Sequence, residues 1–536
     1  MKTNHPNRHK KSESGVALLI AIFVLMLISV IAISLIVASG SESTLAGNYR
    51  SSSAAYLAGT AGLEEARGRL LQKNADYFNK APNNTPATNF IPTAGPLAIG
   101  QVRYILNPAQ GENVATLLAT YPDTEYATEF GAAPVAANVK TIASASTVTS
   151  GGTTYYGPLF KWVRITAATE ASIQTDVDNS GGAPNNTAPL YYDPSHLPKP
   201  SLIVPPMVGG VPNLAAFPNA RQALEITTLA VLTNGTTNVS QKTLQYVVAP
   251  VVYPLNFPSA LTLAGNSVQF GGANSNQYYV DGHDGAGNPP AVAGCTPTSA
   301  VLPAIGTTGV TNVTNVVNPT SPVSPYTGIP SNRDDHYLGV MPSPLPVTPN
   351  PYPSVGNVSL SSGLQTPASL NAIVGTITQN ADVVISPTPV APTAGNPSGQ
   401  GTATENDMPS GMSATNPMTV VVNGNFSMTG NYTGYGLLVV TGNFAYSGTT
   451  GWKGIVLVVG DGTTTFLGSG GGNNEFDGAI FSASTKDAAG NPLTSFGNVA
   501  FDISGGGGNG IYYNSCWINQ ANQPPTYQVL SFRELH

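Results

Sequence analysis

The residues of this chain that come nearest to known chemistry are carboxylates gathered in turns. The segment Asp176–Gly181 matches the start of an EF-hand calcium loop, with Asp at its first and third positions and Gly at its sixth. The twelfth position of such a loop supplies a bidentate Glu, and here that position is Thr187. We therefore interpret this segment as an Asx-rich turn, with a calcium site as the alternative.

Two other turns carry groups that could ligate a metal ion. Carboxylates and an imidazole meet in the glycine-rich segment Asp281–Gly285 and in the consecutive residues Asp334-Asp335-His336. Neighbouring polar residues of this kind more often form a solvated turn than a metal site. Because the chain has no HExxH, CxxC, GxSxG or P-loop motif, we expect no metal, no other cofactor and no catalytic residue.

Paired carboxylates at set separations hydrolyse glycosidic bonds. Between residues 419 and 481 the candidates are Asp461, Glu475 and Asp477, which we expect at the edges of repeated strands. The sequence favours a protein that is not an enzyme, with a carbohydrate-active enzyme as an alternative.

Composition places most of the chain outside the cytoplasm and argues against nucleic-acid binding. Charged residues make up 9% of 536 residues, the formal net charge is −7, and Gly and Pro number 58 and 45. A nucleic-acid-binding protein would show basic clusters. The two cysteines, Cys295 and Cys516, form a plausible disulfide in an exported protein; two unrelated buried thiols are the alternative.

The N-terminal segment predicts a membrane-spanning helix. A basic leader ends at Ser14-Gly15, and the 22 residues Val16–Val37 carry no charge. At about 1.5 Å per residue they would span roughly 33 Å, enough to cross a bilayer. Positive charge before an apolar segment keeps the N-terminus cytoplasmic. The residues leave open whether a peptidase cuts after Gly15 or the segment is an uncleaved signal anchor.

The helix is predicted to continue as an amphipathic segment to about residue 75. One face is marked by residues spaced by threes and fours: Leu45, Tyr49, Ser52, Tyr56, Gly59, Leu63, Ala66 and Leu70. This stripe could pack against neighbouring helices or dock onto the protein's own β-domain. Different parts of the same helix could also make each kind of contact.

This segment resembles the PilX N-terminal family of type IV pilus assembly proteins over residues 14–66. The pieces that carry the resemblance are Gly15-Val16-Ala17-Leu18, the motif Ala46-Gly47-Asn48-Tyr49-Arg50 after Leu45, and Ala55-Tyr56-Leu57-Ala58. The resemblance implies cleavage after Gly15 by a prepilin peptidase, Val16 as the mature N-terminus, and a minor subunit that partners other pilin subunits.

Two positions lack a Glu that major pilins or members of the PilX N-terminal family carry, and members of this family often lack the first of these Glu residues too. Major pilins carry Glu at the fifth mature position, where this chain has Ile20, which argues against a bulk fibre subunit. The PilX N-terminal family usually has Glu where this chain has Thr60.

Residues 76–255 are predicted to form a pilin-like, β-rich domain. Four strands are expected, at Gln101–Leu106, Leu159–Thr166, Ala223–Leu232 and Thr243–Val252. The last two flank a turn sequence, Asn234–Asn238, and should form a hairpin.

A repeat organises the C-terminal part. Residues 419–436 and 437–454 align without gaps and share identical residues at seven of 18 positions, and a third unit begins at Ile455. Short apolar runs ended by Gly or Asn at a fixed period indicate stacked coils. We expect a right-handed parallel β-solenoid, with Val421 and Val439 in one inward ladder and Phe426 and Phe444 in another. An antiparallel meander is the alternative.

The rest of residues 256–536 is assigned to the same solenoid-like domain. Residues 260–281 are expected to supply its first coils, and residues 283–415 a Pro-, Thr- and Asn-rich excursion with one helix near Ser369–Gln379. The C-terminal segment Tyr527–Leu535 is expected to close or cap the stack.

The sequence therefore predicts an α+β, mostly β protein with four parts: leader 1–15, membrane and amphipathic helix 16–75, pilin-like domain 76–255 and solenoid-like domain 256–536. The favoured function is a minor pilin-like component of type IV pilus or related filament assembly, at the tip or in the priming complex, held in the inner membrane. A membrane-anchored adhesin whose solenoid binds a surface ligand is the alternative, and an anchored carbohydrate-active enzyme a second one.

Overall fold

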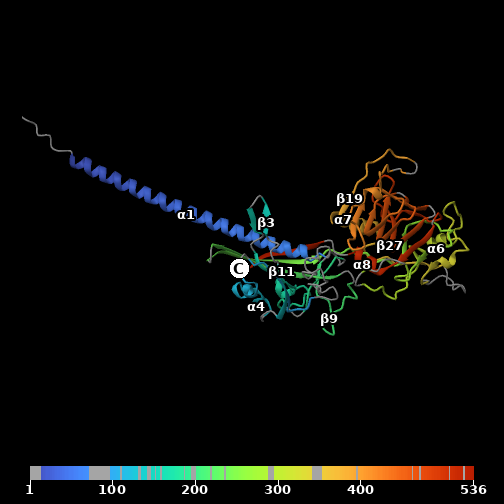
Figure 1. Ribbon diagram of the computed structural model, residues 1–536, viewed down its shortest axis with the longest axis horizontal. Coiled ribbons are helices and arrows are strands. Elements are labelled where there is room, and N and C mark those ends of the chain that lie inside the picture. The colour runs from blue at the N-terminus through green and yellow to red at the C-terminus, as the bar shows by residue number, and fades with distance from the viewer. Residues whose placement is uncertain are drawn as a thin grey trace, which may run out of the picture.

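A long helix, an antiparallel sheet and a region of parallel strands make up the molecule (Figure 1). The computed structural model describes residues 14–71, 97–108, 112–130, 135–141, 147–150, 153–156, 160–185, 188–194, 201–217, 220–234, 237–287, 292, 295–340, 353–393, 396, 398–461, 463–469, 472–505, 507–522 and 526–535. The predicted leader lies almost wholly outside these residues.

Helix α1 (Ser14–Arg69) is continuous for 56 residues, about 84 Å at roughly 1.5 Å per residue. Its polar residues do not interrupt it, because their hydroxyls donate to backbone carbonyls one turn earlier. Ser29 Oγ lies 2.8 Å from the Leu25 carbonyl oxygen and Ser34 Oγ 2.8 Å from that of Val30. The expected change from an apolar to an amphipathic segment therefore occurs within one unbroken helix.

The second half of α1 packs on the first sheet (Figure 1). Leu63 and Ala66 are fully buried in the core between the helix and this sheet. Two glycines make the close approach possible. A Cβ at Gly59 would lie 2.8 Å from Leu244 Cδ1, and one at Gly62 would lie 2.6 Å from Thr228 Oγ1. These glycines face the protein's own sheet.

The first sheet has six strands in the order β2-β1-β5-β11-β12-β30. Their bounds are β1 Gln101–Leu106, β2 Val135–Thr141, β5 Phe160–Ala167, β11 Leu224–Asn234, β12 Thr237–Pro250 and β30 Tyr527–Leu535. Strands β1 and β2 run parallel, and the other neighbours are antiparallel. The four predicted strands are all present, and the predicted hairpin between β11 and β12 is confirmed.

The C-terminal strand β30 pairs with β12, from Thr243↔Leu535 to Pro250↔Tyr527. The prediction that this segment caps the repeats is therefore wrong. Its side chains explain the placement, because Phe532 meets Tyr246 and Tyr56 edge to face, at ring-centroid distances of 5.6 and 6.1 Å. Strand β30 thus covers the edge of β12 and contacts α1.

Two open sheets of parallel strands form the larger C-terminal region. The first contains β13 Leu261–Ala264, β15 Tyr278–Asp281, β16 Ile305–Thr307, β17 Tyr337–Leu338, β18 Val355–Asn357, β19 Val383–Ile385, β21 Met418–Val422, β23 Thr433–Val440, β25 Gly451–Asp461, β27 Asn473–Lys486 and β29 Gly508–Tyr513. The second contains β14 Val268–Gly271, β20 Thr402–Thr404, β22 Asn425–Met428, β24 Phe444–Ser447, β26 Thr463–Ser469 and β28 Asn498–Asp502. From β20 to β29 the chain alternates between the two sheets.

The strand register follows the repeat that the sequence shows. Val421 pairs with Val439 and Phe426 with Phe444, both in parallel strands. An antiparallel meander is therefore excluded for these strands. Glycines mark the same corner in successive strands, because Gly436, Gly454 and Gly478 all have positive φ and lie side by side. A Cβ at Gly478 would lie 1.8 Å from the Gly454 carbonyl oxygen, so no larger residue fits.

The first parallel sheet is buried on both faces. Val420 and Val422 face the core between the two sheets, together with Phe426 and Phe444. Val421 and Val439 point the other way, into a core shared with helices α7 (Pro367–Gln379) and α8 (Ser515–Ala521). The predicted Phe pair is inward, whereas the Val421 and Val439 ladder lies on the outer, helix-covered face.

The order of the strands in space differs from their order along the chain. Residues 260–281 supply β13, β14 and β15, which pair with β27, β28 and β29. The segment expected to supply the first coils thus pairs with the last parallel strands of the chain. The predicted excursion reaches the other end of the two parallel sheets, where it adds β19 beside β21 and β20 beside β22, so the parallel pairing begins before residue 419.

Short elements complete the fold. The helices are α3 Leu117–Thr120, α4 Thr124–Phe130, α5 Glu170–Ile173 and α6 Val310–Val317, with 3-10 turns at Val114–Thr116, Asp334–His336 and Glu405–Asp407. The small antiparallel pairings join β3 Thr147–Ser150 to β4 Thr153–Tyr156, β6 Tyr191–Asp193 to β7 Ser201–Ile203 and β10 Arg221–Gln222, and β8 Met207–Val208 to β9 Val211–Pro212.

Candidate functional site

The first half of α1 presents a continuous apolar surface. Every large apolar side chain from Val16 to Val37 is exposed, by 48–71%. In Figure 1 this half of the helix stands clear of the sheets. By length and composition, α1 is a candidate membrane span or signal sequence, and it is the one such helix among the described residues.

Residues 46–50, on which the resemblance noted in the sequence partly rests, lie on this free part of the helix. Ala46, Gly47, Asn48, Tyr49 and Arg50 are all exposed, and the Tyr49 side chain is 77% exposed. A Cβ at Gly47 would have nothing within 4 Å. The motif is therefore available to something outside the described fold, whereas the lower part of the predicted stripe is used for docking.

Ile20 and Thr60, the two positions at which related proteins can carry Glu, lie in different settings. Ile20 is exposed on the free half of α1, among the other apolar side chains. Thr60 lies near the sheet, and its hydroxyl donates to the Tyr56 carbonyl oxygen at 3.0 Å. Gly15 is helical and Val16 is exposed, so the predicted processing point is at the start of α1, while residues 1–13 lie outside the described part.

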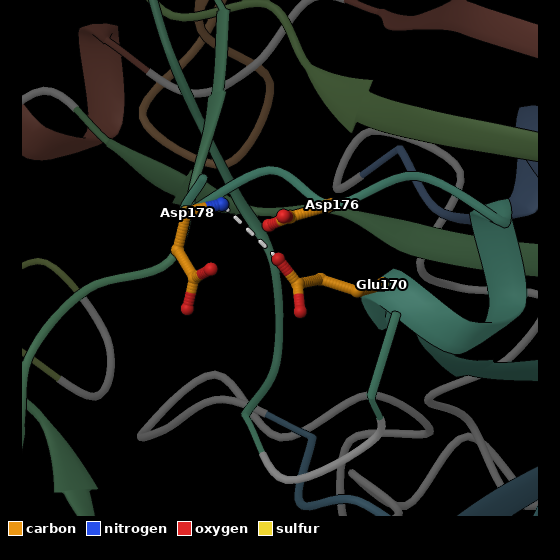
Figure 2. Close-up of side chains that lie close together, drawn as sticks. All are labelled: Glu170, Asp176 and Asp178. Carbon is orange, nitrogen blue, oxygen red and sulfur yellow. Dashed lines mark hydrogen bonds between the residues drawn. The ribbon is translucent and has the colours of Figure 1, made fainter. Parts of the chain in front are cut away.

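The turn predicted from the calcium-loop match gains a third carboxylate from an earlier element. Figure 2 shows Glu170, at the start of α5, directed toward the loop that carries Asp176 and Asp178. One ligand atom from each residue lies within 4.8 Å of the others. The sequence match missed Glu170 because it precedes the loop by one helical turn. Thr187, at the twelfth position of the calcium-loop match, lies outside the described residues.

Backbone amides already occupy these carboxylates. Glu170 Oε1 accepts from the Val177 and Asp178 amides at 2.8 and 3.1 Å, the second bond being the dashed line in Figure 2. The Asp176 carboxylate accepts from the Ser180 and Gly181 amides at 3.2 and 3.0 Å. Hydrogen bonds from Ser180 lower the pKa of Asp178. The geometry is that of an Asx-rich turn closed over a buried Glu.

The second predicted turn divides its groups between two tasks. Asp281 Oδ1 lies 2.7 Å from His283 Nδ1. Asp284 turns instead to the first residue of α8, where its carboxylate accepts from the Ser515 amide and hydroxyl at 2.7 and 2.6 Å. Burial raises the pKa of Asp284, but four hydrogen bonds from Ser515 and Thr298 lower it by more. The net result is a lowered pKa of Asp284. Asp284 therefore fixes a loop to a helix.

The consecutive residues Asp334, Asp335 and His336 do not converge on one point. His336 stacks on the Tyr279 ring at a centroid distance of 4.5 Å, and its Nδ1 lies 3.0 Å from the Tyr278 carbonyl oxygen. The Asp335 side chain is 72% exposed. This imidazole packs as a structural side chain.

Glu475 and Asp477 are brought together, and both meet an amine that sequence reasoning missed. Lys453 Nζ donates to Glu475 Oε1 at 2.6 Å and also contacts Asp477 Oδ2. Lys453 lies on β25, directly opposite Asp477 on β27. The side chain of Asp461 lies outside the described residues. A single Lys carries no sequence signal, and its separation of 24 residues from Asp477 differs from the 18-residue repeat, so the sequence does not indicate this pairing.

A disulfide joins Cys295 to Cys516, with 5.8 Å between their Cα atoms. The pairing considered from the sequence is thus present. Cys516 is buried in the first turn of α8, and Cys295 lies in the loop that also carries Asp284. The bond ties that loop to the helix that covers the outer face of the first parallel sheet.

Comparison of the chain with protein-family models and with curated proteins gives no match. Among solved structures, the chain is similar to the competence-associated pilin ComZ from Thermus thermophilus, at 9% sequence identity. The similarity covers 74% of this chain and 87% of that chain, with a TM-score of 0.16. At that score the likeness carries no argument about fold or function.

Proposed function

We propose that this protein is a minor pilin-like component of a type IV pilus or a related filament, at the tip or in the priming complex. Its N-terminus would be cytoplasmic, α1 would cross the inner membrane, and both β-regions would be exported. The resemblance of residues 14–66 to the PilX N-terminal family supports cleavage between Gly15 and Val16 and contact with other pilin subunits.

The observation that carries this proposal is the division of α1 into two halves. The half that ends at Arg69 is docked on the sheet, while the half that begins at Val16 exposes its apolar side chains on all sides. Burying one such side chain gains about 1.5–3 kcal/mol. The exposed apolar half of α1 therefore requires a bilayer or a bundle of similar helices around it. In assembly, this half of the helix would move from the bilayer into such a bundle.

The size of the exported part supports a terminal position. The parallel sheets and their covering helices extend well beyond the sheet that holds α1 (Figure 1). A body of this size would be hard to repeat at every subunit along a fibre. Ile20 also fits a place at the end of the filament. A subunit with no subunit ahead of it has no neighbouring N-terminal amine to pair with, and so needs no carboxylate at this position.

We further infer that the parallel region is a right-handed β-solenoid. The alternation of strands between two sheets and the register of one repeat per coil support this inference. We also propose that the region is not an enzyme that acts on a separate substrate. In support, the carboxylates of Glu475 and Asp477 both contact Lys453. They are therefore not a pair of carboxylates open to a substrate from solvent.

Sheared surface filaments test the proposal directly. We expect the protein in the filament fraction, beginning at Val16, with labelled protein at filament ends and fewer filaments in a deletion strain. Even labelling along the fibre, or normal filaments after deletion, would count against a tip or priming role. Uniform display on the membrane, with none in filaments, would favour the anchored adhesin.

A further inference from the structure

Lys453, Glu475 and Asp477 form a buried cluster between two adjacent coils. Lys453 is 6% exposed and Asp477 1%. The two residues lie opposite each other in parallel strands, and Lys453 Nζ contacts Asp477 Oδ2 directly. Glu475 lies two residues earlier on the same face of β27, and its Oε1 is 2.6 Å from the same nitrogen. One amine therefore faces two carboxyl groups.

A loop closes this cluster from outside. A Cβ at Gly287 would lie 2.1 Å from Asp477 Oδ1 and 3.1 Å from the Tyr512 ring, so the backbone there lies against the carboxyl group. The disulfide from Cys295 and the hydrogen bonds of Asp284 hold the same loop to α8. Among the described residues, none donates a hydrogen bond to Asp477 Oδ1. Water is thus largely excluded from this carboxyl group.

Burial in such a place favours neutral groups over ions. Burial raises the pKa of Asp477, the contact with Lys453 lowers it, and the neighbouring Glu475 raises it, with a net result well above the ordinary range of an Asp. The Asp477 carboxyl group is therefore favoured in its protonated form, in direct contact with the side-chain amine of Lys453. These are the two functional groups that condense to an amide.

We propose that Lys453 and Asp477 become joined by an intramolecular isopeptide bond, with Glu475 as the catalytic residue. The three groups are held on rigid strands in direct contact, and well-oriented intramolecular reactions reach effective molarities of about 10⁵–10⁸ M. The closed surroundings favour the products because the reaction removes two charges and releases water from a dry site.

The reaction is balanced without any co-reactant. The Lys453 nitrogen attacks Cγ of the protonated Asp477, and a C–N bond forms. Glu475 takes a proton from that nitrogen and delivers it to the hydroxyl group on Cγ, whose C–O bond breaks as water leaves. Glu475 returns to its starting state, no electron is transferred, and the protein loses one water molecule.

Mass spectrometry of the full exported chain, digested with trypsin under reducing conditions, tests the bond. Trypsin cuts after a free Lys but not after an acylated one. We expect no cut after Lys453 and one fragment, residues 334–486, whose mass is lower than its sequence by one water. Separate fragments 334–453 and 454–486, with unmodified masses, would overturn the proposal.

Two controls make the result specific. Lys161 pairs with Glu112 at 2.6 Å and is equally buried, but the Glu112 side chain is 25% exposed; the same digest should cut after Lys161. Glu475→Gln keeps both reacting groups and should restore cutting after Lys453 together with the full mass. If Glu475→Gln lowers thermal stability but leaves the bond intact, Glu475 is structural and its assigned role is wrong.

Discussion

At the residue scale, the most unusual group in the first sheet is the buried Arg164. Its guanidinium contacts three carboxylates, those of Asp123, Glu129 and Glu225, at 3.1, 2.5 and 2.9 Å. Arg533 from the C-terminal strand adds a second cation, 3.2 Å from Glu129. Three carboxylates thus share two guanidinium groups. Buried ions are tolerated only when paired, so one of the carboxyl groups tends to keep its proton.

The excess of carboxyl groups over guanidinium groups in this cluster predicts that the stability of the fold depends on pH. Burial, and then the neighbouring Glu225, raise the pKa of Glu129 to about 8, although Arg164 lowers it. A Glu in the unfolded chain titrates near 4.5. Between these values the folded state holds a proton that the unfolded state has lost, so the free energy of unfolding falls as the pH rises from about 4.5 to 8.

Denaturant unfolding of the full chain in detergent, followed at pH 5, 6, 7 and 8, measures this dependence. We expect the midpoint to fall across the series in the wild type. Glu129→Gln, which mimics the protonated form, should flatten the curve. An equal slope in both proteins would show that another group is responsible.

At the scale of elements, the docking of α1 depends on small residues at two positions. Gly59 and Gly62 lie against side chains of the sheet, whereas Gly40 and Gly47 have nothing within 4 Å of a built Cβ. Glycine thus allows close contact with the sheet in the second half of the helix, whereas in the first half it faces no other part of the described structure. Substitutions at the two kinds of position can therefore distinguish docking of α1 on the sheet from its assembly with other helices.

Gly62→Ala and Gly47→Ala form a matched pair. Ala is favoured over Gly in a helix by about 1 kcal/mol, and at Gly47 nothing opposes that gain. At Gly62 the new Cβ would lie 2.6 Å from Thr228 Oγ1 and 2.9 Å from the Phe160 ring, and overpacking costs about 1–3 kcal/mol. We expect Gly62→Ala to lower the thermal midpoint and Gly47→Ala to leave it unchanged or higher. Equal midpoints would mean that the helix does not dock as described.

The sequence predicts elements well where the signal is local or periodic. Strand Gln101–Leu106 and the register of Phe426 with Phe444 both follow from patterns within a few residues or one repeat. Pairings over long separations have no such signal. Nothing in Tyr527–Leu535 tells that its partner is β12, and nothing in Asp176–Gly181 indicates that Glu170 completes the cluster.

At the scale of the whole molecule, β30 is the element whose removal we expect to have the largest effect. Deletion of residues 527–535 would uncover the backbone of β12 from Thr243 to Pro250 and remove Phe532 from Tyr56 and Tyr246. Open strand edges promote aggregation. We expect the truncated chain to be degraded by added protease faster than the wild type and to self-associate.

Phe532→Ala is the control for this deletion, since it removes the ring and keeps the backbone pairing. It should cost about 3–5 kcal/mol at most, less than the deletion, because the side chain is 43% exposed. Wild-type protease resistance in the truncated chain would show that β30 contributes little to the first sheet.

The pairing of Pro250 with Tyr527 also sets the order of events during export. Residues 251–526 are one long connection between neighbouring strands, so the sheet that holds α1 is completed only after the whole parallel region has been synthesised. In the proposed topology, β30 also crosses the membrane after the parallel region. A chain interrupted anywhere in the parallel region cannot complete its first sheet, and completion of this sheet therefore reports that synthesis and export have passed the parallel region.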